Sequence, residues 1–141
     1  MSLFNVFNIT ASGMSAQSIR LNTTASNIAN ADSVSSSIDQ AYRARHPVFA
    51  AAMQKAAAGQ NKDESVGVQV LGIVESDKPL NVEYVPAHPM ADKDGFIYKP
   101  NVNVIEEMTN MISASRSYQT NVQLAESAKN MLNKTLTLGQ R

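Results

Sequence analysis

The chain of 141 residues contains no cysteine, no tryptophan and no net formal charge. Without cysteine, neither a disulfide framework nor a thiol nucleophile can form. Twelve basic residues balance twelve acidic ones, so the basic surface of proteins that bind nucleic acid or anionic membranes is missing. Aromatic residues make up only 6% of the chain. We therefore expect one domain, or a small domain with long arms, rather than a large self-contained core.

Long apolar runs are also absent. None approaches the roughly 20 residues that a membrane-spanning helix needs. The start, MSLFNVFNIT, has no basic region before an apolar one, and the first positive charge is Arg20. A cleaved secretory signal is therefore not visible, and taken alone this pattern predicts a cytoplasmic protein.

Proline and glycine are missing from Asn103 to Leu138, which predicts one helix of about 54 Å at roughly 1.5 Å per residue. The Asn103 side chain can cap its start, and Glu106 can return to the amide of the capping residue. Gly139 then stands where helices commonly end.

This helix carries two apolar rows at alternating steps of three and four residues, the spacing of a coiled-coil seam. The first comprises Met108, Met111, Ser115, Tyr118, Val122, Ala125, Lys129, Leu132 and Leu136. The second comprises Leu124, Ala128, Met131, Thr135 and Leu138. A single amphipathic core helix is the simpler interpretation. The length favours a helix with more than one partner, because it is roughly three times that of an average globular helix.

The N-terminal stretch predicts a second helix, from about Leu3 to Ala29. Its apolar row contains Phe4, Phe7, Ala11, Met14, Ser18, Leu21, Ala25 and Ile28. Arg20 is the only charged side chain between Met1 and Ala31. Serine, threonine and asparagine take the place of the usual lysine and glutamate, and they can be buried between helices by hydrogen bonding. A merely polar, marginal helix is the alternative, and in isolation this helix is expected to be weak.

Between the helices we expect a small antiparallel β module. Tyr42, Val48 and Phe49 around Pro47 are typical of an edge strand at best. Strands are predicted from Val66 to Val74, from Leu80 to Val85 and from Phe96 to Lys99. Lys55 to Ser65 has the composition of a loop tip.

The predicted fold class is therefore mainly α with a small β insert, in which the long N- and C-terminal helices pair as an antiparallel coiled coil. Residues 1–38 form the N-terminal helical arm, 39–100 the β-rich insert and 101–141 the C-terminal helix. The first and last of these make one discontinuous helical domain.

Residues that could carry chemistry do not combine into a site. His46 and His88 each precede a proline without a second metal ligand at useful spacing. Asp92-Lys-Asp-Gly resembles the start of a calcium loop, but its glycine comes too early and no glutamate closes it. Glu106 and Glu107 are explained by the helix dipole. We predict no enzyme activity, no cofactor and no metal; a small hydrolase using Asp92 or Asp94 is the remaining enzymatic alternative.

Three stretches resemble bacterial flagellar axial proteins: SGMSAQSIRLNTTASNIANADSV from Ser12, NVNVIEEMTNMISASRSYQTN from Asn101 with the closing LTLG, and the middle segment DKPLNVEYVPAHPMADKDGFIYKPNVNV. The middle segment is similar to proximal-rod proteins in particular. Asn103 replaces an expected aspartate, and Lys55 to Glu64 matches no part of the family pattern.

The resemblance implies a structural subunit of the proximal rod that assembles helically into a drive shaft around the export channel. It implies export through the flagellar type III apparatus without a cleaved signal, which reverses the cytoplasmic prediction and places the rod across the periplasm. Expected partners are copies of the chain, other rod proteins and the export apparatus, with no nucleic acid and no membrane insertion. The alternative is a soluble coiled-coil adaptor or secreted effector that binds a single partner. The expected assembly interface comprises Phe4, Phe7, Met14, Leu21, Ile28, Met108, Met111, Tyr118, Val122, Leu124, Met131, Leu132, Leu136 and Leu138.

Overall fold

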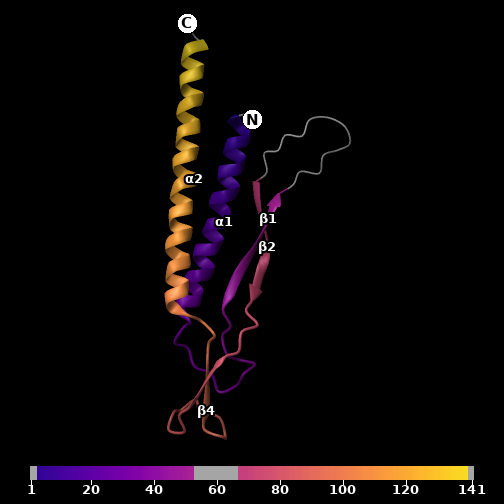
Figure 1. Cartoon of the computed structure of the whole chain (residues 1–141), viewed down its shortest axis with the longest axis vertical. Coiled ribbons are helices and arrows are strands. Elements are labelled where there is room, and N and C mark those ends of the chain that lie inside the picture. Colours follow the sequence, from indigo (N-terminus) through magenta and orange to yellow (C-terminus); the bar gives the residue numbers. More distant parts are fainter. Residues whose placement is uncertain (1–2, 53–66, 140–141) are drawn as a thin grey trace, which may run out of the picture.

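Two long helices run antiparallel along the molecule in the computed structural model, which describes residues 3–52 and 67–139. Helix α1 spans Leu3–Ala29 and helix α2 spans Val104–Gly139. They pack side by side, and α1 begins at the end of the molecule where α2 finishes (Figure 1). The predicted helix pair is confirmed, with bounds close to those expected.

The cap of α2 forms through Asn103. Its Oδ1 accepts hydrogen bonds from the amides of Ile105 and Glu106 at 3.1 and 3.4 Å. The reciprocal half of the expected pattern differs, because the Glu106 carboxylate lies 3.9 Å from Lys78 Nζ instead of returning to the Asn103 amide. This ion pair is solvent-exposed, so it adds little stability.

Hydroxyl groups inside α1 are satisfied by the helix itself. Thr10 and Thr23 donate to the carbonyls of Val6 and Ile19, four residues earlier, at 2.9 and 2.7 Å. These bonds allow both threonines to be buried without an orphaned donor. A helix rich in serine and threonine can therefore occupy the centre of a fold.

The insert contains two separate hairpins, where one β module was expected. Strand β1 (Arg45–Ala52) pairs antiparallel with β2 (Gly67–Glu75), with an irregularity between Val48 and Phe49. Strand β3 (Asn81–Tyr84) pairs antiparallel with β4 (Phe96–Lys99). Each is a two-stranded sheet. The region around Pro47 forms strand β1, which is an edge strand because its sheet has two strands, as its sequence predicted. The expected loop tip, Lys55 to Ser65, lies outside the described residues.

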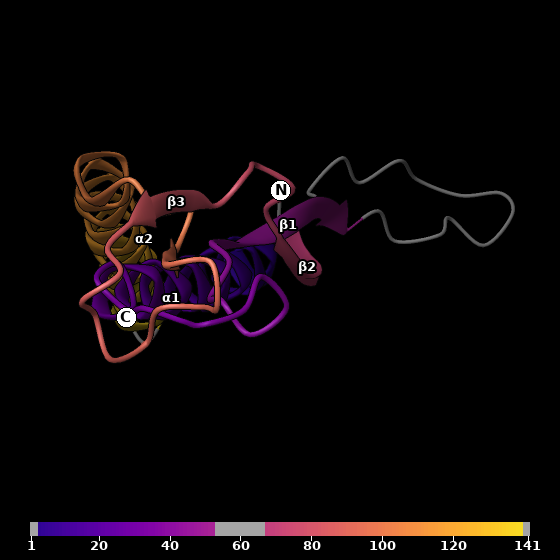
Figure 2. The ribbon, with the colours of Figure 1, turned by 90° about the horizontal axis from the view of Figure 1, so that it is seen from below.

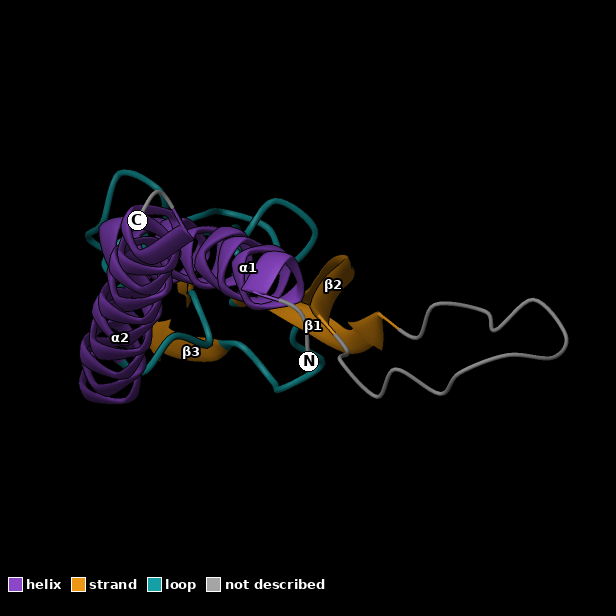
Figure 3. Cartoon of the chain, turned by 90° about the horizontal axis from the view of Figure 1, so that it is seen from above, coloured by secondary structure: helices purple, strands orange, loops and turns teal. Residues whose placement is uncertain are grey.

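Helix α1 is the middle layer of the molecule. The β1–β2 hairpin packs on one side of it and α2 on the other (Figures 1 and 3). The β3–β4 hairpin lies at the lower end of the molecule in Figure 1, which we call the foot. It lies beyond the ends of the helices, as the view from below also shows (Figure 2). An isolated bridge between Ser35 and Tyr98 ties β4 to the connector that follows α1.

Gly95 is the last residue of the long loop that joins β3 to β4, and its amide closes a turn with the Asp92 carbonyl at 2.9 Å. Its φ is +82°, a conformation that favours glycine. The rings of Tyr84 and Phe96 then meet edge to face, with centroids 5.2 Å apart. This contact closes the base of the hairpin.

Candidate functional site: the helix junction and the open helix faces

The most deeply buried positions between the elements are small or polar. On α1 and α2 they are Thr10, Ala16, Thr23, Thr24, Asn27, Glu107, Ala114 and Ala128. The expectation that threonine and asparagine side chains of α1 can be buried between the helices is therefore confirmed at Thr23 and Asn27. Because α1 contacts both α2 and the first hairpin, the polar side of the helix is enclosed and the apolar row is left at its flank.

Asn27 is the central residue of this junction and is 0% exposed. Its Nδ2 donates to the Arg45 carbonyl at 2.8 Å and to Glu107 Oε2 at 3.0 Å. Its Oδ1 accepts from the Arg45 amide and the Tyr42 hydroxyl, both at 2.9 Å. One side chain thus joins α1, the connector, β1 and α2, with both donors and both acceptor positions used.

Glu107 corrects the expectation that the acidic pair at the start of α2 serves only the helix dipole. Its side chain is only 3% exposed and is held by Asn27 across the helix interface. The sequence carried a weak signal for this contact, namely an uncharged, amide-rich helix and a carboxylate one turn inside another helix. Neither feature identifies the partner.

Two further contacts define the register of the helices. Arg20 Nη2 donates to Asn110 Oδ1 at 3.1 Å. A Cβ added to Gly13 would lie 2.9 Å from Asn121 Nδ2, so this glycine allows close approach of the helices. Extending the register at 1.5 Å per residue places the start of α1 level with about residue 131.

The last two turns of α2 therefore have no α1 residue opposite them. Leu136 and Leu138 are 60% and 73% exposed. Phe4, at the open end of α1, is 68% exposed. This end of the helix pair carries a cluster of large apolar side chains that the described part of the chain leaves open.

The remaining predicted assembly residues divide into half-buried and exposed sets. Those that are half-buried along the flanks of the pair are Phe7, Met14, Leu21, Ile28, Met111, Val122 and Leu132. Those that are exposed are Met108, Tyr118, Leu124 and Met131. The two predicted rows of α2 do not separate into a buried and an exposed one, because Ala128 of the second row is buried while Met108 of the first is 53% exposed.

Sequence reasoning missed one apolar stripe on the outer face of α2. Ile105 and Ile112 are 77% and 55% exposed, and Met108 lies between them. Their spacing of three and four residues was visible in the sequence. It was overlooked because Met108 had been assigned to a different row.

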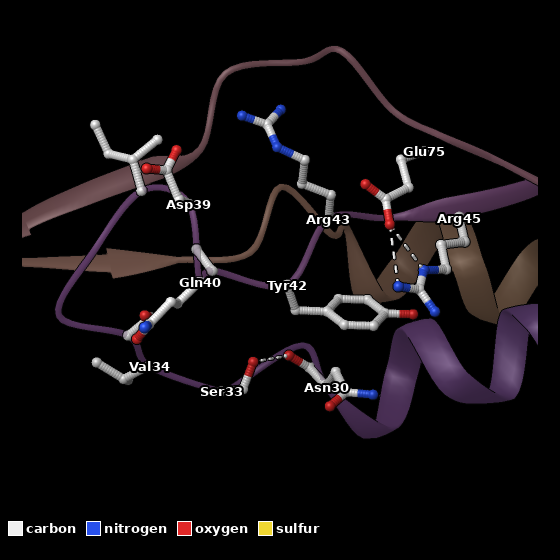
Figure 4. A pocket seen from close by; sticks show the side chains of 12 residues that line it. Asn30, Ser33, Val34, Asp39, Gln40, Tyr42, Arg43, Arg45 and Glu75 are labelled. Carbon is white, nitrogen blue, oxygen red and sulfur yellow. Dashed lines mark hydrogen bonds and ion pairs between the residues drawn. The ribbon is translucent and has the colours of Figure 1, made fainter.

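A hollow of about 650 Å³ lies at the foot, between the connector and the first hairpin (Figure 4). Arg45 forms an ion pair with Glu75 at 3.0 Å and lies 5.5 Å from the centroid of the Tyr42 ring. The lining also holds Arg43 and Asp39, so its basic and acidic groups balance. It contains no nucleophile–base pair and has the character of a polar notch between elements.

The residues considered for chemistry have structural contacts. The Asp92 main-chain carbonyl accepts a hydrogen bond from the Gly95 amide and closes a turn, and Asp92 Oδ1 accepts one from the Lys93 amide at 2.7 Å. His88 Nδ1 accepts a bond from the Met90 amide at 3.1 Å. No group of three or more histidine, aspartate or glutamate residues that could hold a metal ion occurs within residues 3–52 and 67–139. Within the same ranges, no helix is both long and apolar enough to cross a membrane.

Comparison with protein families places this helix pair among flagellar rod proteins. The family described as "Flagella basal body rod protein" matches residues 7–35, and the family "Flagellar basal body rod FlgEFG protein C-terminal" matches residues 93–138. The two matches cover most of α1 and nearly all of α2, the elements joined by Asn27 and Glu107.

Full-length relatives narrow the class. The chain is 48% identical over 140 residues to the flagellar basal-body rod protein FlgC of Salmonella typhimurium, covering 99% of this chain and 100% of the relative. It is 49% identical over 140 residues to that of Yersinia enterocolitica, with the same coverage. FlgC of Borreliella burgdorferi is 34% identical over 151 residues, covering 99% of both chains. The chain belongs to the FlgC family of flagellar basal-body rod proteins, which are structural components and not enzymes.

Proposed function

We propose that this chain is a structural subunit of the proximal rod, which assembles helically into the shaft that transmits motor torque and encloses the export channel. The observation that carries the proposal is the exposure of large apolar side chains along α2, together with Phe4 at the start of α1. Leu124, Met131 and Leu138 are 50%, 58% and 73% exposed and recur at seven-residue intervals on α2. Contiguous apolar surface of this kind marks contact with other proteins.

The solvent-facing side of α1 supports the same proposal. Its exposed residues are Phe4, Asn8, Ala11, Ser15, Ser18, Asn22, Ala25 and Ala29. None of them is charged. Solvated helix faces normally carry lysine and glutamate, which resist burial. A face without charge can be covered by a neighbour without the cost of desolvating ions.

The proposed neighbours are copies of this chain and other rod proteins. The FlgC family and the resemblance to axial proteins support a place in the rod that crosses the periplasm. They also support export through the flagellar type III apparatus without a cleaved signal. Neither nucleic-acid binding nor membrane insertion has a part in this function.

Complementation tests the proposal. The chain, produced in a flagellated bacterium that lacks its own FlgC, should restore motility and completed basal bodies, and electron microscopy should find it in the rod. A chain that is secreted but forms a discrete one-to-one complex in size-exclusion chromatography, without entering basal bodies, would instead be an adaptor or effector. That result would refute the rod function.

A further inference from the structure

The outer edge of β2 near the foot of the first hairpin is open, whereas the corresponding edge of β1 is covered. Arg45 turns both its amide and its carbonyl toward Asn27 of α1. These groups therefore point away from β2. In an antiparallel pair, the amide and carbonyl of every second residue along a strand point to the same side. Pro47, opposite Ile73, has no amide to offer at this edge.

Ile73 lies opposite Pro47, which is two residues from Arg45. The amide and carbonyl of Ile73 therefore point away from β1. Higher in the hairpin, α1 covers β2, because the Val68 amide donates to Ser12 Oγ at 3.2 Å. At the lower end of the hairpin α1 therefore lies beside β1, and at the upper end it lies beside β2. The outer edge of β2 from Gly72 to Glu75, at the lower end, faces away from α1. Ile73 and Val74 are 54% and 55% exposed.

Gly72 provides a second, independent observation. Its φ is not positive, since Gly95 is the only such glycine among the described residues. A Cβ added to Gly72 would meet nothing within 4 Å, whereas one added to Gly67 of the same strand would lie 2.8 Å from Ser12 Oγ. Gly72 adjoins the irregularity of the hairpin, where Leu71 has no partner in the register, and glycine inside a strand commonly marks either such a bulge or the close approach of another backbone. The open space beside Gly72 leaves room for the second of these.

We propose that Gly72–Glu75 pairs with the outer edge of β3 in a second copy of this chain, so that the two hairpins form one four-stranded sheet. This inference rests on the proposed assembly into a rod. β3 spans four residues, Asn81–Tyr84, all of them exposed. The outer edge of β4, the partner strand of β3, is already occupied, because Tyr98 forms a bridge with Ser35 of the connector. Within the described residues, β2 and β3 are thus the strands that retain an open edge at the foot.

Pairing between different edges suits a shaft. A contact of β2 with β3 is head to tail, so each subunit offers one edge and accepts the other, which generates a ring or a helix. Charge does not oppose the pairing, because Glu75 is already paired with Arg45 and Glu83 with Lys99. A two-stranded sheet is marginally stable alone, and strand addition gives it new main-chain hydrogen bonds.

Engineered cysteines test the contact without background, because the chain has none of its own. Basal bodies carrying both Ile73→Cys and Val82→Cys are treated with a short bis-maleimide. This cross-linker is long enough to join the two cysteines even if the strand register differs by one residue. We expect a ladder of cross-linked copies, and less than a tenth of that cross-linking with either single variant. Equal cross-linking of a single variant, or no ladder in motile cells that carry both cysteines, would overturn the proposal.

A glycine pair provides the second measurement. Gly72→Val should leave the midpoint of urea unfolding unchanged or higher, because valine favours strands and the site is open. It should lower the yield of completed basal bodies at least tenfold. Gly67→Val, the matched variant, should lower the unfolding midpoint. Normal basal bodies with Gly72→Val would refute the strand pairing but not the rod function. Failure of the unmodified chain to complement would refute the rod function itself.

Discussion

Replacing Asn27 with leucine is the sharpest test of the polar junction. The substitution keeps a similar volume and improves helix propensity by a few tenths of a kcal/mol, but it removes four hydrogen bonds. Arg45 is exposed and Tyr42 is half-buried. Water can therefore partly replace Asn27 at the Arg45 amide and carbonyl and at the Tyr42 hydroxyl. Glu107, at 3% exposure, cannot.

The expected loss follows from these environments. A hydrogen bond to a charged group contributes about 1.5–3 kcal/mol, and each neutral one about 1 kcal/mol. Allowing for water at Arg45 and Tyr42, Asn27→Leu should reduce the free energy of unfolding by about 3–5 kcal/mol. Glu107→Leu should reduce it less, because the Asn27 amide keeps the Arg45 carbonyl as acceptor.

Urea unfolding of the single variants and of the double variant measures the coupling. With both residues changed to leucine, the loss should be smaller than the sum of the two single losses by about 1.5–3 kcal/mol, because no buried carboxylate is left without a donor. Asn22→Leu, at an exposed position of α1, is the control and should stay within about 0.5 kcal/mol. Additive losses, or an Asn27→Leu chain as stable as the unmodified one, would show that the junction is incidental.

Three further predictions concern the open faces and the foot. Met131→Ser should leave the secreted subunit level normal and reduce completed basal bodies, since burying a methionine contributes up to roughly 1.5–3 kcal/mol; Leu132→Ser should lower both. Normal basal bodies with Met131→Ser alone would mean that this face stays in water. Leu21→Glu should abolish motility by placing an unpaired carboxylate in a contact, whereas Lys93→Glu, on an exposed turn, should be tolerated; equal motility of the two would contradict this. Gly95→Ala should cost about 1–2 kcal/mol of stability through its left-handed conformation, and an unchanged urea midpoint would disprove that strain.

The bounds of the helices could be predicted because their signals are local. Asn103 caps α2 with its own side chain, and α2 ends at Gly139. The strands were likewise found from β-branched residues between turn residues. What local signals could not supply was the number of hairpins, since pairing depends on which segments meet in space. The predicted domain division at residues 38 and 100 stays a prediction.

The buried face of α1 differs from its apolar row for a physical reason. An apolar row marks the buried face of a helix that has one partner and otherwise faces water. Helix α1 has partners on two sides, so its polar side is enclosed and hydrogen-bonded. The role of Asn27 depends on residues 18 and 80 positions away. Side-chain type alone cannot reveal such distant partners.

The polar junction and the apolar flanks divide two tasks between them. Small and apolar side chains fit many helix registers almost equally well, whereas a buried amide that must meet one carboxylate favours a single register. If the chain builds a rod, every copy must present Phe4, Met131 and Leu138 at the same height, because an error of register in one subunit would displace its contacts with all neighbours. Asn27 and Glu107 would then fix the shape of the subunit, and the exposed apolar residues would supply adhesion between subunits. The Asn27→Leu chain should accordingly lose ordered rods even where its secreted level is restored by overproduction. Normal rods under that condition would show that neighbouring subunits, rather than the junction, set the register.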